Sequence, residues 1–156
     1  MFPTPQTMPL TADCLVRMAP QQLDWLYANA AIAPIPCGKV RGRAVVWPGS
    51  RLAGSASQVA RAAWQGKVFD PGGAMAVNRF FGLKMIRGRV YAGESWRDGC
   101  PALILDYQDT SWVYARYRDE IRQVAPGLYL GLMYARTEPA PKLKMYFVLE
   151  TESCAR

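Results

Sequence analysis

The sequence predicts a mainly β protein, an antiparallel β-barrel of about seven or eight strands with one or two N-terminal helices. Two observations and one physical constraint support this prediction. Apolar and charged residues alternate over 39–46, which is the pattern of a half-buried strand. From residue 68 to 150, short runs rich in β-branched and aromatic residues alternate with turn segments. A sheet of this size would expose its edges unless it closed, so a barrel is expected, with an open sheet curved around a helix as the alternative.

The 156 residues are expected to form a single barrel domain over 1–156, with helical segments at about 11–31 and 51–65. In the first segment Thr11 can cap a helix, and apolar residues repeat at helical spacing. Pro20 leaves open whether this segment is one helix or two. The second segment is rich in alanine and ends before Gly66.

Strands are expected from residue 38 and from 68 to 150. The first alternates between two sets, which are Val40, Gly42, Ala44 and Val46 on one face and Lys39, Arg41 and Arg43 on the other. A strand over 111–118 would place Trp112, Tyr114, Arg116 and Arg118 on one face. The run over 127–134 is apolar on both faces, which predicts a central strand covered on both sides.

The chain contains no histidine. This absence excludes Ser-His-Asp and Cys-His catalysis, His-ligated zinc and His-ligated haem. Any proton chemistry would have to use Asp, Glu, Tyr, Cys or Lys. We expect no metal and no cofactor.

The net charge is +7, and 14 of the 19 basic residues are Arg. These residues are scattered along the chain rather than grouped on a helix, which disfavours nucleic acid as a partner. We expect no secretory signal, because MFPTPQTMPL lacks a basic segment followed by an apolar one, and the sequence has no C-x-x-C spacing and no apolar run long enough to cross a membrane. We therefore expect a cytoplasmic protein without a transmembrane segment that binds a hydrophobic or acidic small molecule. A homodimer is also compatible with the sequence.

Asp106 and Tyr107 are the candidate catalytic residues. Asp106 ends an apolar run, and in a continuing strand it would share a face with Ala102 and Ile104. A carboxylate that faces inward would need an Arg partner and, with a nearby Tyr, would form a minimal acid–base set. The alternative is a strand-end Asp that bonds the backbone of the following turn.

The charged string RDEIR, residues 118–122, has two interpretations. In the first, Arg118, Glu120 and Arg122 form a ladder on the solvent face of a strand, and Asp119 caps a turn. In the second, Arg118 or Arg122 points into the barrel mouth and binds an acidic or carbonyl-bearing ligand. The expected wall of the ligand site is aromatic and consists of Trp96, Trp112, Tyr114, Tyr129 and Tyr134.

Two strings carry a resemblance to known proteins. GESWRDGCPALILDY and RDEIRQVAPGLYLGLMY resemble a group of small bacterial proteins that share G-x-S-W-x-D-G-x-P, L-D-Y and R-D-E-I-R-x-V-x-P-G-L-Y-L-G, a pattern that implies no known activity. More distantly, residues 119–122 with the following G-L-Y-L are similar to the end of the plastid lipid-associated (fibrillin) proteins, which are lipocalin-like. This resemblance implies a calycin-type barrel. The lipocalin G-x-W motif near the first strand is not met, because Val45 lies where its glycine would precede Trp47.

The leading functional prediction is binding of an apolar or amphipathic small molecule, lipid-like or an aromatic metabolite, in the barrel cavity. One alternative is a cofactor-free isomerase, cyclase or hydrolase that acts on a hydrophobic metabolite. In that enzyme Asp106 would act as acid or base, while Tyr107 and an Arg polarise an oxygen. Another alternative is a protein-interaction module with a filled barrel. The sequence leaves enzymatic activity undecided.

Overall fold

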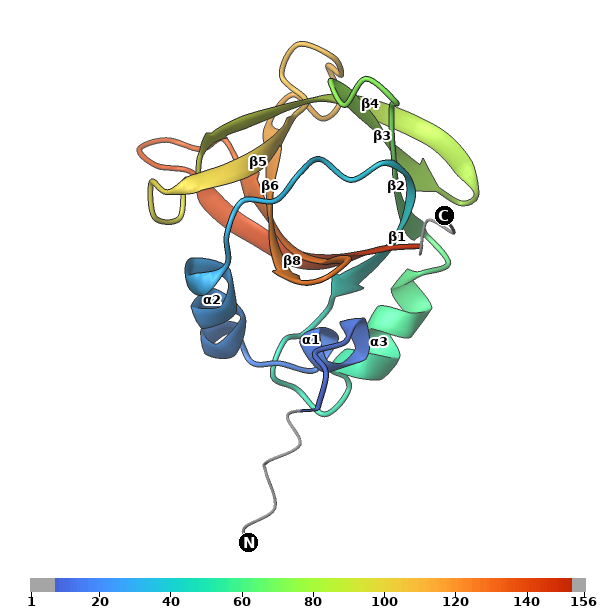
Figure 1. Cartoon of the computed structure of the whole chain (residues 1–156), viewed down its shortest axis with the longest axis vertical. Helices are drawn as coiled ribbons and strands as arrows, with labels where there is room; N and C mark the ends of the chain where they lie inside the picture. The colour runs from blue at the N-terminus through green and yellow to red at the C-terminus, as the bar shows by residue number, and fades with distance from the viewer. Residues whose placement is uncertain (1–7, 153–156) are drawn as a thin grey trace, which may run out of the picture.

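A computed structural model describes residues 8–152 and shows a closed antiparallel barrel of eight strands in chain order (Figure 1). The strands are β1 (Gly38–Val45), β2 (Trp64–Phe69), β3 (Met75–Phe80), β4 (Leu83–Glu94), β5 (Pro101–Asp106), β6 (Tyr117–Ala125), β7 (Leu128–Ala135) and β8 (Lys142–Thr151). Each pairs with the next, and β8 returns to β1 with Gly42 opposite Leu149. The predicted fold class, an antiparallel barrel, is confirmed. Closure of the barrel leaves no sheet edge unpaired.

The first helical segment consists of two helices, α1 (Ala12–Val16) and α2 (Pro20–Asn29). Thr11 caps α1, since its hydroxyl accepts a hydrogen bond of 3.2 Å from the Cys14 N–H. Pro20 occupies the first turn of α2, where its missing N–H costs nothing. No helix among residues 8–152 is long and apolar enough to cross a membrane.

The second predicted helical segment forms helix α3 (Ala53–Ala60), which is shorter than predicted. Trp64 already belongs to β2, so the expectation of helix to residue 65 is wrong. Gly66 does not end a helix but lies in β2 with a φ of 122°, at an irregularity of the strand where it pairs closely with Arg41 of β1. A Cβ atom at Gly66 would lie 2.2 Å from the Val40 carbonyl oxygen. Only glycine allows the two strands to approach this closely.

The predicted strand over 111–118 is also wrong. Residues 112–116 form turns, and β6 begins at Tyr117. The Ser111 hydroxyl accepts a hydrogen bond of 3.1 Å from the Tyr114 N–H, which closes a local turn in competition with strand pairing. Trp112 consequently lies on the surface, 91% exposed.

The helices lie together on one side of the barrel and cover its outer face there (Figure 1). Leu23 and Tyr27 of α2 and Leu15 of α1 belong to one buried cluster with outward residues of β7 and β8. The outward residues of β7 are Leu128, Leu130, Leu132 and Tyr134. The inner face of β7 is also covered, because Tyr129 is buried within the barrel. The expectation that this strand is covered on both sides is confirmed.

The interior of the barrel has a filled half and a half that contains a cavity. The filled half is an apolar cluster that includes Val40, Phe69, Val90, Ile121 and Leu149. The segment between α2 and β1 crosses this end of the barrel (Figure 1), and Ala33 is buried in the same cluster. The Tyr129 hydroxyl donates to the Pro34 carbonyl oxygen at 3.3 Å. This end is therefore closed by the chain itself.

Candidate functional site

The cavity has a volume of 220 Å³ and a wall that is mainly aromatic and apolar. Its apolar side chains include Trp64, Phe80, Met133, Met145 and Phe147. The indole of Trp64 meets the Phe147 ring edge-on, with centroids 5.6 Å apart, so these two rings hold each other in place. A concave apolar wall with few polar groups is typical of small-molecule sites.

Four polar side chains meet on the cavity wall, each from a different strand or its end. Lys67 comes from β2, Asn78 from β3, Tyr107 from the end of β5 and Asp119 from β6. The Lys67 ammonium donates to Asn78 Oδ1 at 2.7 Å, to the Tyr107 hydroxyl oxygen at 2.8 Å and to Asp119 Oδ2 at 2.9 Å. The Tyr107 hydroxyl donates to Asp119 Oδ2 at 2.7 Å. We call these four residues the polar cluster.

The polar cluster is buried and contains one ion pair. The side chains of Lys67 and Asp119 are 2% and 6% exposed. Two such charges remain ionised in a protein interior only when each compensates the other. Burial and then the negative charge of Asp119 raise the pKa of Tyr107 well above its ordinary value. Tyr107 is therefore a hydrogen-bonding group rather than a proton donor near neutral pH.

One atom of the polar cluster is not satisfied. Asp119 Oδ1 is buried and has no hydrogen-bond partner among residues 8–152. A buried carboxylate oxygen without a partner is costly, and because this one belongs to a residue that lines the cavity, it is a candidate contact for a ligand.

Asp106 does not reach the cavity. Tyr107 faces inward, so strand alternation places Asp106 on the outer face. Its carboxylate accepts hydrogen bonds from Tyr91 at 2.9 Å, from Arg136 at 2.6 Å and from the Gln108 N–H at 3.0 Å. Burial alone would raise the pKa of Asp106, but these hydrogen bonds outweigh it and lower the pKa. The inward interpretation is wrong, and the strand-end interpretation is confirmed.

Both interpretations of the RDEIR string are wrong. Arg118, Glu120 and Arg122 are neither solvated nor directed into the barrel, because they are buried on its outer face. Asp119 caps no turn and points inward instead. Glu120 accepts hydrogen bonds from the Tyr27 hydroxyl at 2.9 Å, from the Trp96 N–H at 2.9 Å and from Ser95.

Arg122 completes this outer network. It binds both carboxylate oxygens of Asp98 at 2.7 Å and the Tyr27 carbonyl oxygen at 3.0 Å. The two strings that carry the bacterial resemblance, GESWRDGCP and RDEIR, therefore contact each other. Their polar residues attach the loop before β5 and helix α2 to β6, which is a structural task.

The five residues of the predicted aromatic wall lie in four environments, one of which is the exposed surface position of Trp112. Tyr114 lines the cavity, and its ring lies 6.0 Å from that of Tyr107. Tyr129 lies in the filled half of the barrel. Trp96 and Tyr134 pack edge-on outside the barrel, with centroids 5.9 Å apart. Arg118 lies over the Trp96 ring at 4.1 Å. Tyr107 and Tyr114 are thus the predicted residues that reach the cavity.

Sequence reasoning missed Lys67, Asn78 and Asp119. A signal for Asp119 existed in the alternation of β6. This alternation places Asp119 on the same face of the strand as Ile121, and Arg118 and Glu120 on the other face. Lys67 shares the inward parity of Phe69, but a single lysine in a short apolar run is weak evidence of burial.

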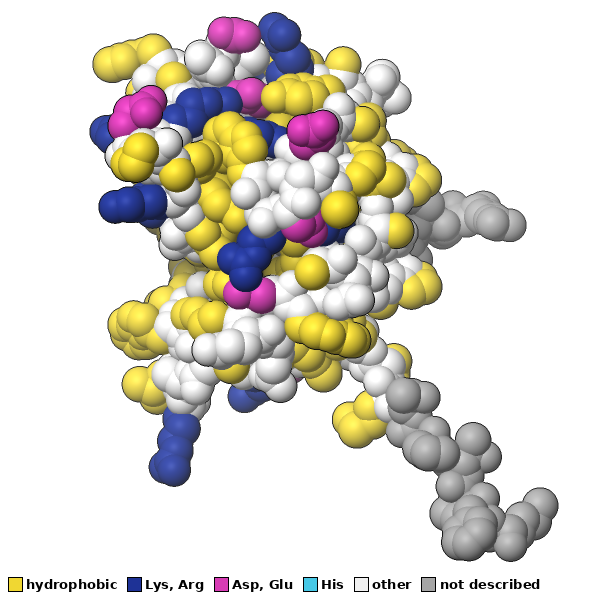
Figure 2. Space-filling model, turned by 90° about the vertical axis from the view of Figure 1, so that its left-hand side faces the viewer, with side chains coloured by type: hydrophobic (Ala, Val, Ile, Leu, Met, Phe, Trp, Pro, Cys, Tyr) yellow, Lys and Arg dark blue, Asp and Glu magenta, His cyan; other side chains and the backbone are white. Residues whose placement is uncertain are grey.

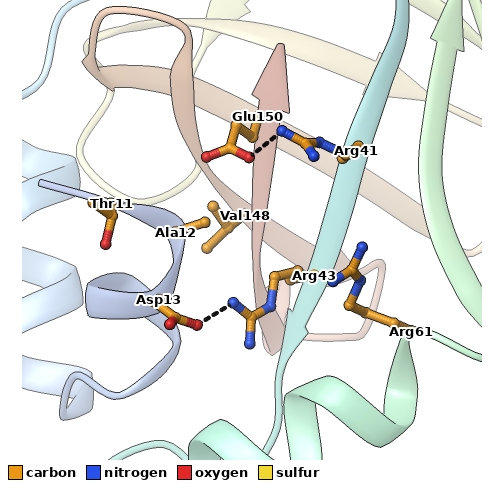
Figure 3. Close-up of a pocket in the computed structure, with 8 residues that line it drawn as sticks. All are labelled: Thr11, Ala12, Asp13, Arg41, Arg43, Arg61, Val148 and Glu150. Atoms are coloured by element: carbon orange, nitrogen blue, oxygen red, sulfur yellow. Dashed lines mark hydrogen bonds and ion pairs between the residues drawn. The ribbon is translucent and has the colours of Figure 1, made fainter. Parts of the chain in front are cut away.

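A larger pocket of 330 Å³ lies on the surface between α1, β1 and β8 (Figure 3). Two of its arginines are already paired, Arg41 with Glu150 at 2.8 Å and Arg43 with Asp13 at 2.5 Å. The predicted outward orientation of these arginines on β1 is confirmed. Because Arg41 and Arg43 are already paired and these pairs are partly solvated, this pocket holds less binding potential than the cavity.

The charges on one face of the molecule are mixed. Figure 2 shows Lys and Arg side chains beside Asp and Glu side chains, with hydrophobic ones between them. Among the described side chains of this face there is no continuous basic surface of the kind that follows a phosphate backbone. Within residues 8–152, no group of three or more Cys, Asp or Glu side chains is placed to hold a metal ion.

Comparison with known proteins supports the fold alone. No protein-family model matches the chain, and no curated protein has significant sequence similarity to it. A protein from Thermomonospora curvata, known from its crystal structure, is similar in fold with a TM-score of 0.53 and 22% sequence identity. The similarity covers 87% of this chain and 89% of that chain, so it includes nearly the whole barrel.

Proposed function

We propose that this protein binds a small amphipathic molecule in the barrel cavity. The observation that carries the proposal is the 220 Å³ space, which combines an apolar aromatic wall with one buried polar cluster. An apolar ligand body would gain from leaving water at about 25 cal/mol per Å² of buried surface. The polar cluster would orient the ligand. The similarity of residues 119–122 and the following G-L-Y-L to the lipid-associated fibrillin proteins points in the same direction.

Catalysis in the same cavity is the second candidate, since Lys67, Tyr107 and Asp119 are the residue types of an acid–base set. The hydrogen bonding favours binding. Each proton of the Lys67 ammonium already has an acceptor, and the Tyr107 proton is held by Asp119. A group that acts as a general acid needs a proton that is free to move toward the substrate.

The proposal predicts that a side chain that fills the cavity weakens ligand binding. Ala44 lines the cavity, so Ala44→Phe should place a ring in the ligand space and weaken binding of naphthalene at least about tenfold. Equilibrium dialysis measures the dissociation constant, and native mass spectrometry of the wild type detects a co-purifying molecule.

The matched control is Ala140→Phe, which adds the same ring at an exposed turn. This variant should bind naphthalene as the wild type does. Equal binding of naphthalene by both variants would show that the cavity is not a ligand site.

A further inference from the structure

The polar cluster has used every proton that it can donate. The three N–H groups of Lys67 bind three acceptors. The two N–H groups of the Asn78 amide bind the Ile86 carbonyl oxygen at 3.2 Å and the Tyr107 hydroxyl oxygen at 3.1 Å. The Trp64 indole N–H binds Asn78 Oδ1 at 3.1 Å. A ligand that needs a donor finds none in this cluster.

The cluster retains an unused acceptor. Asp119 Oδ1 is buried without a partner, and Asp119 lines the cavity. A ligand hydroxyl or N–H group that reached this atom would remove the cost of an unpaired buried oxygen. The hydrogen-bonding capacity of the site therefore matches a ligand that donates.

The charge of the site selects a neutral donor. Lys67 already neutralises Asp119 at 2.9 Å. A ligand ammonium would bring a second cation to one carboxylate beside a mainly apolar wall, at a large desolvation cost. A ligand carboxylate would bring a second anion to the unpaired oxygen and would be repelled. This argues against the acidic ligand that the sequence suggested.

We propose that the cavity is selective for a neutral aromatic molecule with a hydroxyl or N–H group, which donates a hydrogen bond to Asp119 Oδ1. This inference rests on the proposed function, because it names the chemistry of that ligand. The volume agrees with a ligand of one or two fused rings, since a dry apolar cavity of about 150 Å³ in another protein holds benzene. The wall of Trp64, Phe80 and Phe147 would pack against the rings.

The test compares four probes that share one apolar body: 2-naphthol, 2-methoxynaphthalene, naphthalene and 2-naphthoate. Equilibrium dialysis against the wild type should give a dissociation constant for 2-naphthol about tenfold lower than those for naphthalene and 2-methoxynaphthalene. The methoxy probe keeps the oxygen but lacks the proton, so it isolates the donor. The carboxylate probe should bind most weakly.

Two variants locate the effect. In Lys67→Met/Asp119→Leu both members of the ion pair become apolar, so naphthalene should still bind while the preference for 2-naphthol disappears. In Asp106→Asn, a carboxylate on the outer face is changed, and the preference should stay as in the wild type.

The outcomes separate the two proposals. Equal binding of 2-naphthol, 2-methoxynaphthalene and naphthalene by the wild type would overturn the donor selectivity and leave the binding cavity intact. Tightest binding of 2-naphthoate would also overturn it, because it would show that the site favours an acceptor. If none of the four probes binds, both the ligand chemistry and the binding function fail.

Discussion

The ion pair between Lys67 and Asp119 stands inside a barrel whose other buried residues are mainly apolar. The Lys67 ammonium also lies 5.4 Å from the centre of the Phe147 ring and 5.5 Å from that of Tyr107. The Phe147 ring partly replaces water around the cation, whereas Tyr107 contacts it through the hydroxyl group. Such a pair adds little to stability compared with an apolar pair. At the residue scale, the pair therefore matters most when only one member is removed.

We predict that Lys67→Met destabilises the protein by about 3–5 kcal/mol, because it leaves the Asp119 carboxylate buried without a counter-ion. The double variant Lys67→Met/Asp119→Leu should recover most of this loss and lie within about 1 kcal/mol of the wild type. Urea unfolding followed by circular dichroism measures the free energy of unfolding. A double variant as unstable as the single one would show that packing, and not the unpaired charge, causes the loss.

At the scale of elements, β6 organises both sides of the barrel wall. Its inward residues Asp119 and Ile121 belong to the cavity and to the filled half, respectively. Its outward residues Glu120 and Arg122 bind α2 and the loop before β5. Burial of Arg122, only 1% exposed, is possible because backbone carbonyl oxygens and Asp98 together accept its protons. One strand thus links the site to the covering helix.

This arrangement predicts that the Tyr27 hydroxyl anchors α2. Tyr27→Phe should cost about 1.5–3 kcal/mol, because Glu120 loses a donor in a fully buried position. Amide hydrogen exchange should accelerate in α2 more than in the barrel strands.

The matched control is Tyr91→Phe, which removes a hydrogen bond to Asp106 at a partly exposed position. It should change stability by less than about 0.5 kcal/mol. If both variants have the same small effect and α2 exchanges as before, the helix is held by its apolar contacts alone.

At the scale of the whole molecule, closure of the barrel buries several tyrosines. Folding makes the ionisation of these tyrosines less favourable. Burial and then the charge of Glu120 raise the pKa of Tyr27, as burial and then Asp119 raise that of Tyr107. An unfolded tyrosine ionises near a pKa of about 10. Because the folded pKa values are higher, this contribution to stability is complete below about pH 10 and is lost as the pH rises above it.

We therefore predict alkaline unfolding in which these tyrosines ionise together with the loss of structure. Absorbance at 295 nm should show an early group among the eight tyrosines and a late group that titrates with the circular dichroism signal. Tyr27→Phe and Tyr107→Phe should each reduce the late group. Ionisation of all eight tyrosines before any change in the circular dichroism signal would contradict this prediction.

Much of the fold was predictable because its determinants are local. The alternation in β1 placed Lys39, Arg41 and Arg43 outside, since the side-chain period of a strand is two. The errors arose where a tertiary contact overrides the local pattern. Gly66 was predicted to end a helix, but it allows the close approach of β2 to β1. The charged string of β6 was predicted to be solvated, but it is covered by α2.

The sequence by itself determined that the fold is mainly antiparallel β with helices near the N-terminus and that histidine chemistry plays no part, because periodicity and composition are properties of the chain alone. It left open whether the sheet closes, and the tertiary structure decided that it forms a barrel. Only the tertiary structure decided which carboxylate faces the cavity. Asp106 and Asp119 are both strand residues, and their orientation depends on register and closure. Closure brings Lys67, Asn78 and Tyr107 from three other strands to Asp119, and such long-range proximity leaves no local trace in the sequence.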